Sequence, residues 1–143
     1  MTRAQSTTEL ASALRLAVLR AARRLRSQRV NTAVTLSQLS ALATVGKCGP
    51  MSAGELAGIE RVQPPSMTKI LASLEAEGWV QRSPHPDDRR QSIISITQSG
   101  RDLLDAETRA RDSWLATRLV DFSPDELRIL SEAVAVLDRL GSE

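Results

Sequence analysis

Apolar residues recur at helical spacing along most of this chain. Over residues 8–29 they fall at intervals of three and four positions, which places them on one face of an amphipathic helix. The residues on that face are Leu10, Leu14, Ala17, Val18, Ala21 and Leu25. Arginines occupy the other face, at positions 15, 20, 23, 24, 26 and 29, and favour a solvated surface over a phosphate-binding one. We therefore predict a first helix over 8–29.

Three shorter helices are predicted between residues 35 and 77, each with a recognisable start. Thr35 with Gln38, and Ser52 with Glu55, have the spacing of capping boxes, in which side chain and backbone satisfy each other's hydrogen bonds. Pro64 suits the first position of the fourth helix, because the amide that it lacks would have no intrahelical partner there. The second, third and fourth helices are therefore expected to begin at these points.

Glycines are expected to end two of these helices. Gly46 and the Gly49-Pro50 pair are predicted to stop the second helix, and Gly78 to follow the fourth in a left-handed conformation.

The apolar residues expected to face inward are Leu36, Leu39, Leu42, Ala43, Leu56, Ala57, Ile59, Met67, Ile70, Leu71 and Leu74. The turn at 60–62 makes the third and fourth helices a candidate helix-turn-helix, a pair that many domains without DNA contacts also contain.

Two strands and a projecting loop follow. Residues 79–82 have strand composition, and over 91–97 Ile94 and Ile96 alternate with polar residues, as in a strand with one buried face. The loop 83–90 between them is rich in Pro, Asp and Ser and ends on Arg89 and Arg90. Two arginines at a hairpin tip can reach a DNA minor groove, where negative potential is concentrated. The order helix, helix, strand, loop, strand predicts a winged helix.

Two further helices complete the pattern. Thr97 is expected to cap a fifth helix over 98–119, and Ser123, Pro124 and Glu126 begin a sixth. The apolar stripe of the sixth helix comprises Leu127, Leu130, Ala133, Val134, Val136, Leu137 and Leu140. This stripe is wider than one short terminal helix needs, so it predicts a dimer interface, with packing inside the subunit as the alternative. Trp114 is expected to pack near that interface or against the fifth helix.

Composition supports a single helical domain. The chain has 143 residues, of which 41% are hydrophobic and 2% aromatic, so the core must be built from aliphatic side chains. The net charge of +2 is small, and where the arginines cluster matters more than their excess. The N-terminal segment lacks the apolar core of a signal peptide, and no stretch has the length of a membrane span. We expect a cytoplasmic protein without a membrane partner.

Residues suited to catalysis are sparse. The one histidine, His85, lies between two prolines of the predicted loop and is expected to face solvent near a phosphate rather than act as a general base. Cys48 has no second cysteine for an intrachain disulfide and no companions for a zinc site, so we expect a structural rather than a redox role. We therefore predict no enzyme activity, no metal and no cofactor.

One segment resembles a known family. The run Pro86-Asp87-Asp88-Arg89-Arg90, followed by Ile93, Ile94, Ile96, Thr97 and Gly100, is similar to the wing signature of the MarR family of bacterial regulators. The segments 53–57 and 71–78 also match that family's register, so the resemblance covers about 35–104. It implies a mainly α fold with a small antiparallel β-hairpin, a winged helix-turn-helix of six helices. One domain, 1–143, would combine a DNA-binding lobe over 31–97 with dimerisation helices in 1–30 and 98–143.

The resemblance also implies a function. It implies a homodimeric repressor that binds double-stranded DNA at a pseudo-palindromic operator and is released by a small apolar or phenolic effector. Asp88 would orient Arg90 by an ion pair, and Arg90, with Arg89 beside it, would enter the minor groove. A winged-helix module that binds proteins and has lost DNA binding is the alternative.

The fourth helix supplies further candidates for DNA contact. Burying its apolar stripe turns a polar N-terminal face outward. With the cap of the third helix, the candidates are Ser52, Gln63, Pro65, Ser66, Thr68 and Lys69. Hydroxyl and amide groups can donate to bases or phosphates, lysine can reach a phosphate or guanine, and proline offers only apolar contact to a thymine methyl. The second proline of Pro64-Pro65 removes another amide from the helix start, which departs from a good anion site.

Overall fold

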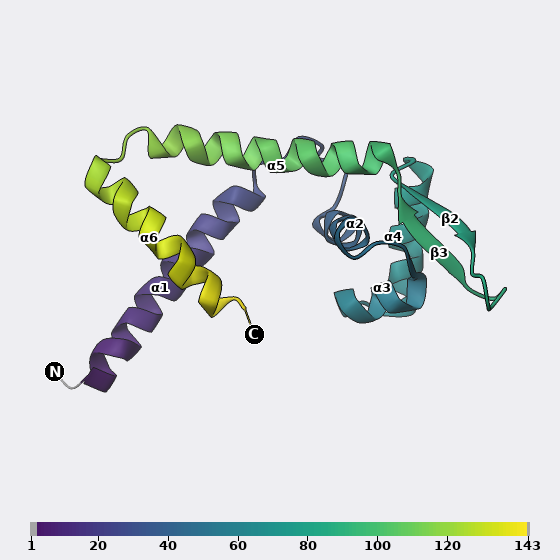
Figure 1. The fold of residues 1–143 in the computed structure, drawn as a ribbon, viewed down its shortest axis with the longest axis horizontal. Helices are drawn as coiled ribbons and strands as arrows, with labels where there is room; N and C mark the ends of the chain where they lie inside the picture. Colours follow the sequence, from purple (N-terminus) through teal and green to yellow (C-terminus); the bar gives the residue numbers. More distant parts are fainter. Residues whose placement is uncertain (1–2, 143) are drawn as a thin grey trace. The chain divides into compact units, whose positions relative to one another are not determined.

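The computed structural model describes residues 3–142, so the first two residues and the last residue of the expected domain lie outside it. Its elements in chain order are α1 (Arg3–Arg26), α2 (Leu36–Cys48), β1 (Met51–Ser52), α3 (Ala53–Glu60), α4 (Pro64–Ala76), β2 (Val80–Pro84), β3 (Ser92–Ile96), α5 (Gln98–Leu119) and α6 (Pro124–Leu140) (Figure 1). The mainly α fold with six helices and a small antiparallel sheet is confirmed over these residues. The first helix spans 3–26 rather than 8–29.

Contacts divide the chain into two compact units. One comprises Arg29–Arg109, and the other the segments before and after it. The division lies inside α5, whereas the sequence placed a boundary at 97/98. The first half of α5 therefore belongs with the winged helix.

The unit Arg29–Arg109 has an aliphatic core between its three short helices and its sheet. The buried residues of this core are Ala41, Leu42, Val45, Met51, Leu56, Ala57, Met67, Leu71, Leu74, Val80, Ile94 and Ile96. Burying each large aliphatic side chain contributes roughly 1.5–3 kcal/mol. These residues include most of the stripe predicted for the helices and both isoleucines predicted for the second strand.

Three residues of that stripe are exposed instead of buried, namely Leu36, Ala43 and Ile59. In α2 the buried residues are Leu39, Ala41, Leu42 and Val45, so Ala41 is buried rather than Ala43. In α3, Ala57 faces inward, and Ile59 points about 200° away from it around the helix.

Gly46 does not end α2, which continues to Cys48. Gly49 is the residue that ends it, with a φ of 85°. A Cβ added at Gly46 would lie 3.3 Å from side-chain carbons of both Ile96 and Leu104. Gly46 therefore allows close packing against the sheet and α5 rather than marking a helix end.

The sheet has three strands in the order β1-β3-β2, all antiparallel. Val80 pairs with Ile96 and Pro84 with Ser92, so β2 runs two residues beyond the predicted 79–82. Ser52 pairs with Ile93 in β1, a strand that sequence reasoning missed because two residues show no alternation. The hairpin of β2 and β3 projects from the helices of its unit (Figure 1).

Backbone contacts join the end of α4 to the sheet and α5. Gly78 has a φ of 76°, as predicted, and its amide and that of Trp79 donate to the last turn of α4. The hydroxyl of Thr97 donates to the Gly78 carbonyl at 2.6 Å and accepts the amide of Gly100 at 3.1 Å. The predicted cap at Thr97 is confirmed, and it also fixes where the hairpin leaves the helices.

A buried carboxylate fastens the chain after α1 to α5. Glu107 is 1% exposed, and its Oε1 accepts the amides of Val30 and Asn31 at 3.2 and 3.1 Å. The Nε of Arg29 lies 3.7 Å from Oε2, and the same guanidinium donates to the carbonyl of Val34. Arg29 was expected on the solvated face of the first helix, and is instead largely buried in this contact.

The second unit exposes apolar surface. Among the described residues none of α6 is buried, and the exposed large apolar side chains there are Leu127, Ile129, Leu130, Val134, Val136, Leu137 and Leu140. Ser123 caps α6 as predicted, and its backbone amide, which donates to the Glu126 carboxylate, lowers the pKa of that group.

Trp114 on α5 is half-buried and stacks with the Arg118 guanidinium, which lies 5.4 Å from the ring centre. In residues 3–142 no helix has the length and apolarity to cross a membrane.

Gly100→Ala is predicted to destabilise the protein. The new Cβ would lie 2.3 Å from the carbonyl oxygen of Trp79 and 2.8 Å from a side-chain carbon of Ile96. Relieving that overlap should cost about 1–3 kcal/mol, measured as a lower free energy of unfolding in urea. Gly58→Ala is the control, because a Cβ there meets nothing within 4 Å and alanine favours the helix. Equal stability of the two variants would contradict the close packing at Gly100.

Glu107→Ala is predicted to lower the free energy of unfolding by about 3–5 kcal/mol, since it leaves Arg29 and two amides without their buried acceptor. Glu107→Gln should lose less, because its amide oxygen can still accept. Asp105→Ala, at an exposed position of the same helix, should stay within about 0.5 kcal/mol of the parent. Thermal and urea unfolding measure all three, and a Glu107→Ala variant as stable as the control would show that the carboxylate is dispensable.

Candidate nucleic-acid interface

The turn between α3 and α4 is held by local bonds and by α2. Arg61 adopts a left-handed conformation with a φ of 54°, and the next amide, that of Val62, donates to the Ala57 carbonyl at 3.0 Å. The carboxylate of Glu60 accepts hydrogen bonds from Ser40, at 2.7 Å, and from Thr44, both on α2. Glu60 therefore fastens the turn to α2 and helps to set the direction in which α4 leaves it.

The first turn of α4 has few amides to offer a ligand. Pro64 and Pro65 have none, and the amide of Met67 donates to the Gln63 carbonyl at 3.0 Å. By helix geometry, Ser66 then holds the one amide of this turn without an intrahelical acceptor. Gln63 makes no side-chain cap bond, so its amide group is available to a ligand. The double proline thus leaves few backbone donors for an anion at this helix start.

The outward face of α4 carries the predicted side chains. Met67, Leu71 and Leu74 are buried, and the candidates at the opposite face are all exposed, namely Gln63, Pro65, Ser66, Thr68 and Lys69. The Thr68 hydroxyl donates to the Pro64 carbonyl at 3.0 Å. The hydroxyl oxygen still has lone pairs, so Thr68 can accept a hydrogen bond while that bond persists. Lys69 is the cation of this face.

The hairpin loop spans 85–91, and Asp88 organises its second half. The Asp88 carbonyl accepts the amide of Gln91 at 3.1 Å, and its Oδ1 accepts the amide of Arg90 at 3.0 Å. The same oxygen lies 3.7 Å from the Nε of Arg90. The Arg90 side chain is 94% exposed and that of Asp88 39%, so the pair leaves the guanidinium open to a ligand. Arg89 beside it is also exposed.

His85 occupies a different environment from the one expected. It is half-buried, and its Nδ1 accepts the amides of Asp87 and Asp88, each at 3.1 Å. His85 was expected to face solvent, and that expectation was wrong because the residue is half-buried and its Nδ1 is bonded to the loop backbone. Composition gave no sign of these bonds, although a residue that accepts from the next two or three amides is a common start of a turn.

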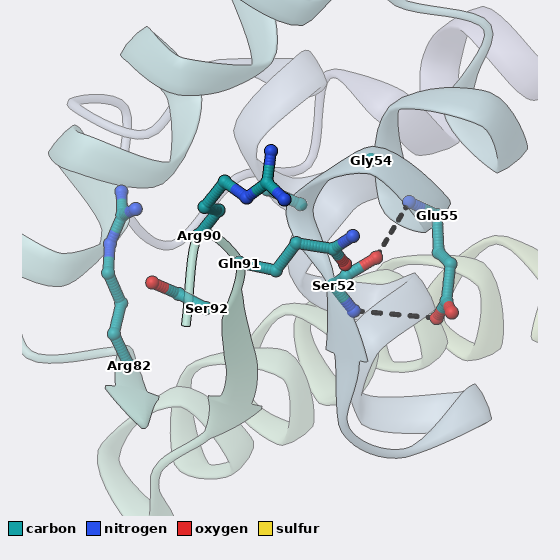
Figure 2. Close-up of a pocket in the computed structure, with 8 residues that line it drawn as sticks. Ser52, Gly54, Glu55, Arg82, Arg90, Gln91 and Ser92 are labelled. Carbon is teal, nitrogen blue, oxygen red and sulfur yellow. Dashed lines mark hydrogen bonds between the residues drawn. The ribbon is translucent and has the colours of Figure 1, made fainter. Parts of the chain in front are cut away.

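An open pocket of about 580 Å³ lies between the loop end of the hairpin and the start of α3 (Figure 2). Its lining comprises Ser52, Ala53, Gly54, Glu55, Arg82, Arg90, Gln91 and Ser92. Arg82, which sequence reasoning did not single out, has its Nε 2.5 Å from the carboxylate of Glu75 on α4. Arg90 therefore brings the less neutralised charge to this pocket.

Ser52 differs from the other predicted contacts. It is 6% exposed, and its hydroxyl oxygen accepts the Glu55 amide at 3.1 Å in the predicted capping box. The hydroxyl proton of Ser52 could still donate to a ligand in the pocket.

Over the described residues no cluster of three or more acidic, cysteine or histidine side chains is suited to a metal, and Cys48 is exposed at the end of α2.

Several known proteins are similar to this chain. Residues 34–92 match the model of the MarR family. An HTH-type transcriptional regulator of Mycobacterium leprae is 48% identical, and one of Mycobacterium tuberculosis 47%, each over 96% of both chains. The crystal structure of a putative transcriptional regulator from Pseudomonas aeruginosa superposes with a TM-score of 0.84 and 27% identity, over 97% of both chains.

A Staphylococcus aureus MepR variant, solved bound to an oligodeoxyribonucleotide, has a TM-score of 0.72 at 19% identity, over 92% of this chain and 97% of that one. At this identity the likeness concerns the fold alone. The family match over the winged helix and the near-complete alignment with mycobacterial regulators identify a regulator rather than an enzyme. This chain belongs to the MarR family of HTH-type transcriptional regulators.

Proposed function

We propose that this protein is a homodimeric, sequence-specific DNA-binding repressor. One observation carries the proposal: within one compact unit, a projecting hairpin presents two exposed arginines and α4 presents an exposed polar face. The MepR variant bound to an oligodeoxyribonucleotide supports it, because that protein shares the fold. A DNA-binding regulator must be in the same compartment as the bacterial chromosome, which supports a cytoplasmic location.

The wing would enter the minor groove. Arg90 is the better placed of its two arginines, because its amide and its Nε both lie against the carboxylate of Asp88. That pairing narrows the directions in which the guanidinium can point, while its high exposure leaves its donors free for DNA. A narrow minor groove concentrates negative potential and favours an inserted arginine. Arg89 would reach the groove or the adjoining phosphates.

The start of α4 would read base edges in the major groove. Thr68 would accept from the amino group of a cytosine or adenine, because its own proton is used within the helix. Ser66 and Gln63 can donate, Lys69 can reach a guanine or a phosphate, and Pro65 can contact a thymine methyl group. With so few free backbone amides at the helix start, side chains and the pocket at Ser52 would bind most of the phosphates.

The exposed apolar faces support a homodimer. An apolar surface of this extent on α6, with further exposed Leu and Val side chains on α1, is costly to leave in water. Pairing with a second copy about a twofold axis would bury it and set two α4 helices in successive major grooves, about 34 Å apart. A pseudo-palindromic operator follows from that symmetry. Release by a small apolar or phenolic effector is proposed on the family resemblance.

Arg90→Ala is predicted to weaken binding to duplex DNA about 5- to 150-fold, which corresponds to about 1–3 kcal/mol, while the dimer stays intact. Arg109→Ala, which removes the same charge from an exposed position of α5, is the control and should bind like the parent. Fluorescence anisotropy at fixed salt measures both. Equal affinity of the Arg90 variant and the parent would refute the wing assignment.

A salt titration of the parent protein separates DNA binding from a protein-interaction module. The logarithm of the affinity for duplex DNA should fall with the logarithm of salt concentration by about 0.9 unit for each phosphate contacted. A flat response would favour the protein-interaction module instead.

Leu137→Asp is predicted to convert the dimer to a monomer, because it places a charge within the apolar stripe of α6. Arg139→Asp introduces the same residue about 200° away on that helix and should leave the dimer intact. Sedimentation equilibrium gives the molecular mass of each. A Leu137→Asp variant that remains dimeric at low micromolar concentration would place the interface elsewhere.

A further inference from the structure

The imidazole of His85 holds the turn of the wing together. Its Nδ1 accepts the amides of Asp87 and Asp88, both at 3.1 Å, and its own amide donates to the Gln91 carbonyl at 3.3 Å. The half-buried ring therefore fixes the first half of the loop, and the backbone amide of His85 joins it to the last residue of the loop. In the described structure both amides donate to this ring nitrogen.

This turn leads directly to the arginines. His85 holds the backbone of Asp88, and the carboxylate of Asp88 in turn accepts the amide of Arg90 and lies beside its Nε. We propose that His85 is a positioning residue for DNA binding, whose neutral imidazole sets the turn that presents Arg89 and Arg90 to the duplex. The proposal rests on the proposed function of the wing.

The protonation state of the ring decides whether it can do this. A neutral imidazole has one nitrogen that accepts, whereas the imidazolium donates from both nitrogens. Protonation of His85 would thus turn the acceptor of two amides into a donor facing them. Histidine changes charge between about pH 5 and 8. The turn, and with it the affinity for DNA, should be intact at the alkaline end of that range and weaken as the pH falls.

Other charges bear on this equilibrium. Within the loop the charged residues are Asp87, Asp88, Arg89 and Arg90. On β2 the charged residue is Arg82, which is already paired with Glu75 of α4, and β3 has no charged residue. DNA phosphates would favour the imidazolium, so a histidine that contacts a phosphate would strengthen binding as the pH falls. The direction of the pH effect therefore distinguishes a positioning residue from a phosphate contact.

The test compares the parent with His85→Asn and His85→Ala. An asparagine Oδ1 can accept the same two amides and does not titrate, whereas alanine has no acceptor. The probe is a labelled duplex enriched from a random pool by the parent protein. At about pH 8 the parent and His85→Asn should bind alike, and His85→Ala about tenfold more weakly. At about pH 5.5 the parent should approach His85→Ala, while His85→Asn keeps its affinity.

A second readout follows the turn itself. In 15N NMR spectra of the free protein, the amide signals of Asp87 and Asp88 should shift together with protonation of the ring. In His85→Asn those two amides should not show this titration. The measurement needs no DNA, so it tests the hydrogen bonds separately from the role in binding.

Three outcomes would overturn the proposal in distinguishable ways. If the three proteins bind the duplex alike at both pH values, His85 has no positioning role although the DNA-binding function stands. If the parent binds more tightly than His85→Asn at the lower pH, His85 is a phosphate contact. If the parent enriches no duplex at either pH, the proposed function fails, and the role of His85 in it fails as well.

Discussion

The hydroxyl of Thr97 makes two hydrogen bonds on which the interface depends. It donates to the carbonyl of Gly78, where α4 ends, and accepts the amide of Gly100, where α5 begins. The Thr97 amide also donates to the Trp79 carbonyl at 3.0 Å. The hairpin leaves and returns to the helices within these few residues, so its base is anchored to α4 and α5 at once. Gly100 is required because a side chain there would overlap the Trp79 carbonyl.

The two parts of the interface use different chemistry. The hairpin offers charge, with Arg90 held near Asp88 and highly exposed. The start of α4 offers side-chain hydrogen bonds and apolar contact, because two prolines remove the backbone donors that many helix starts present to phosphates. We expect affinity for DNA to come mainly from the wing and from phosphate contacts, and discrimination between bases mainly from α4. We therefore expect the position of the wing to affect DNA binding more than any single residue of α4.

Local sequence patterns were enough to predict most of the fold. They could not predict the contacts between residues that lie far apart in the sequence. The capping boxes, the left-handed Gly78 and the two main strands follow from short-range rules, which hold because their partners lie within a few positions. Burial of Glu107 depends on amides more than seventy residues away, so no local pattern indicated it. Gly46 was misassigned because its role is packing against Leu104. The exposed candidates of α4 follow from helix geometry, whereas the acceptor role of His85 depends on the exact path of the loop.

We propose that a twofold pair of chains reads duplex DNA with α4 and the arginine hairpin. Selection of bound sequences from a pool of random duplexes tests it most directly. A twofold dimer should enrich an inverted repeat whose half-sites are centred about 10 base pairs, or one helical turn, apart. Enrichment of a single unrepeated site would contradict the twofold arrangement. The absence of any enriched sequence would contradict specific DNA recognition.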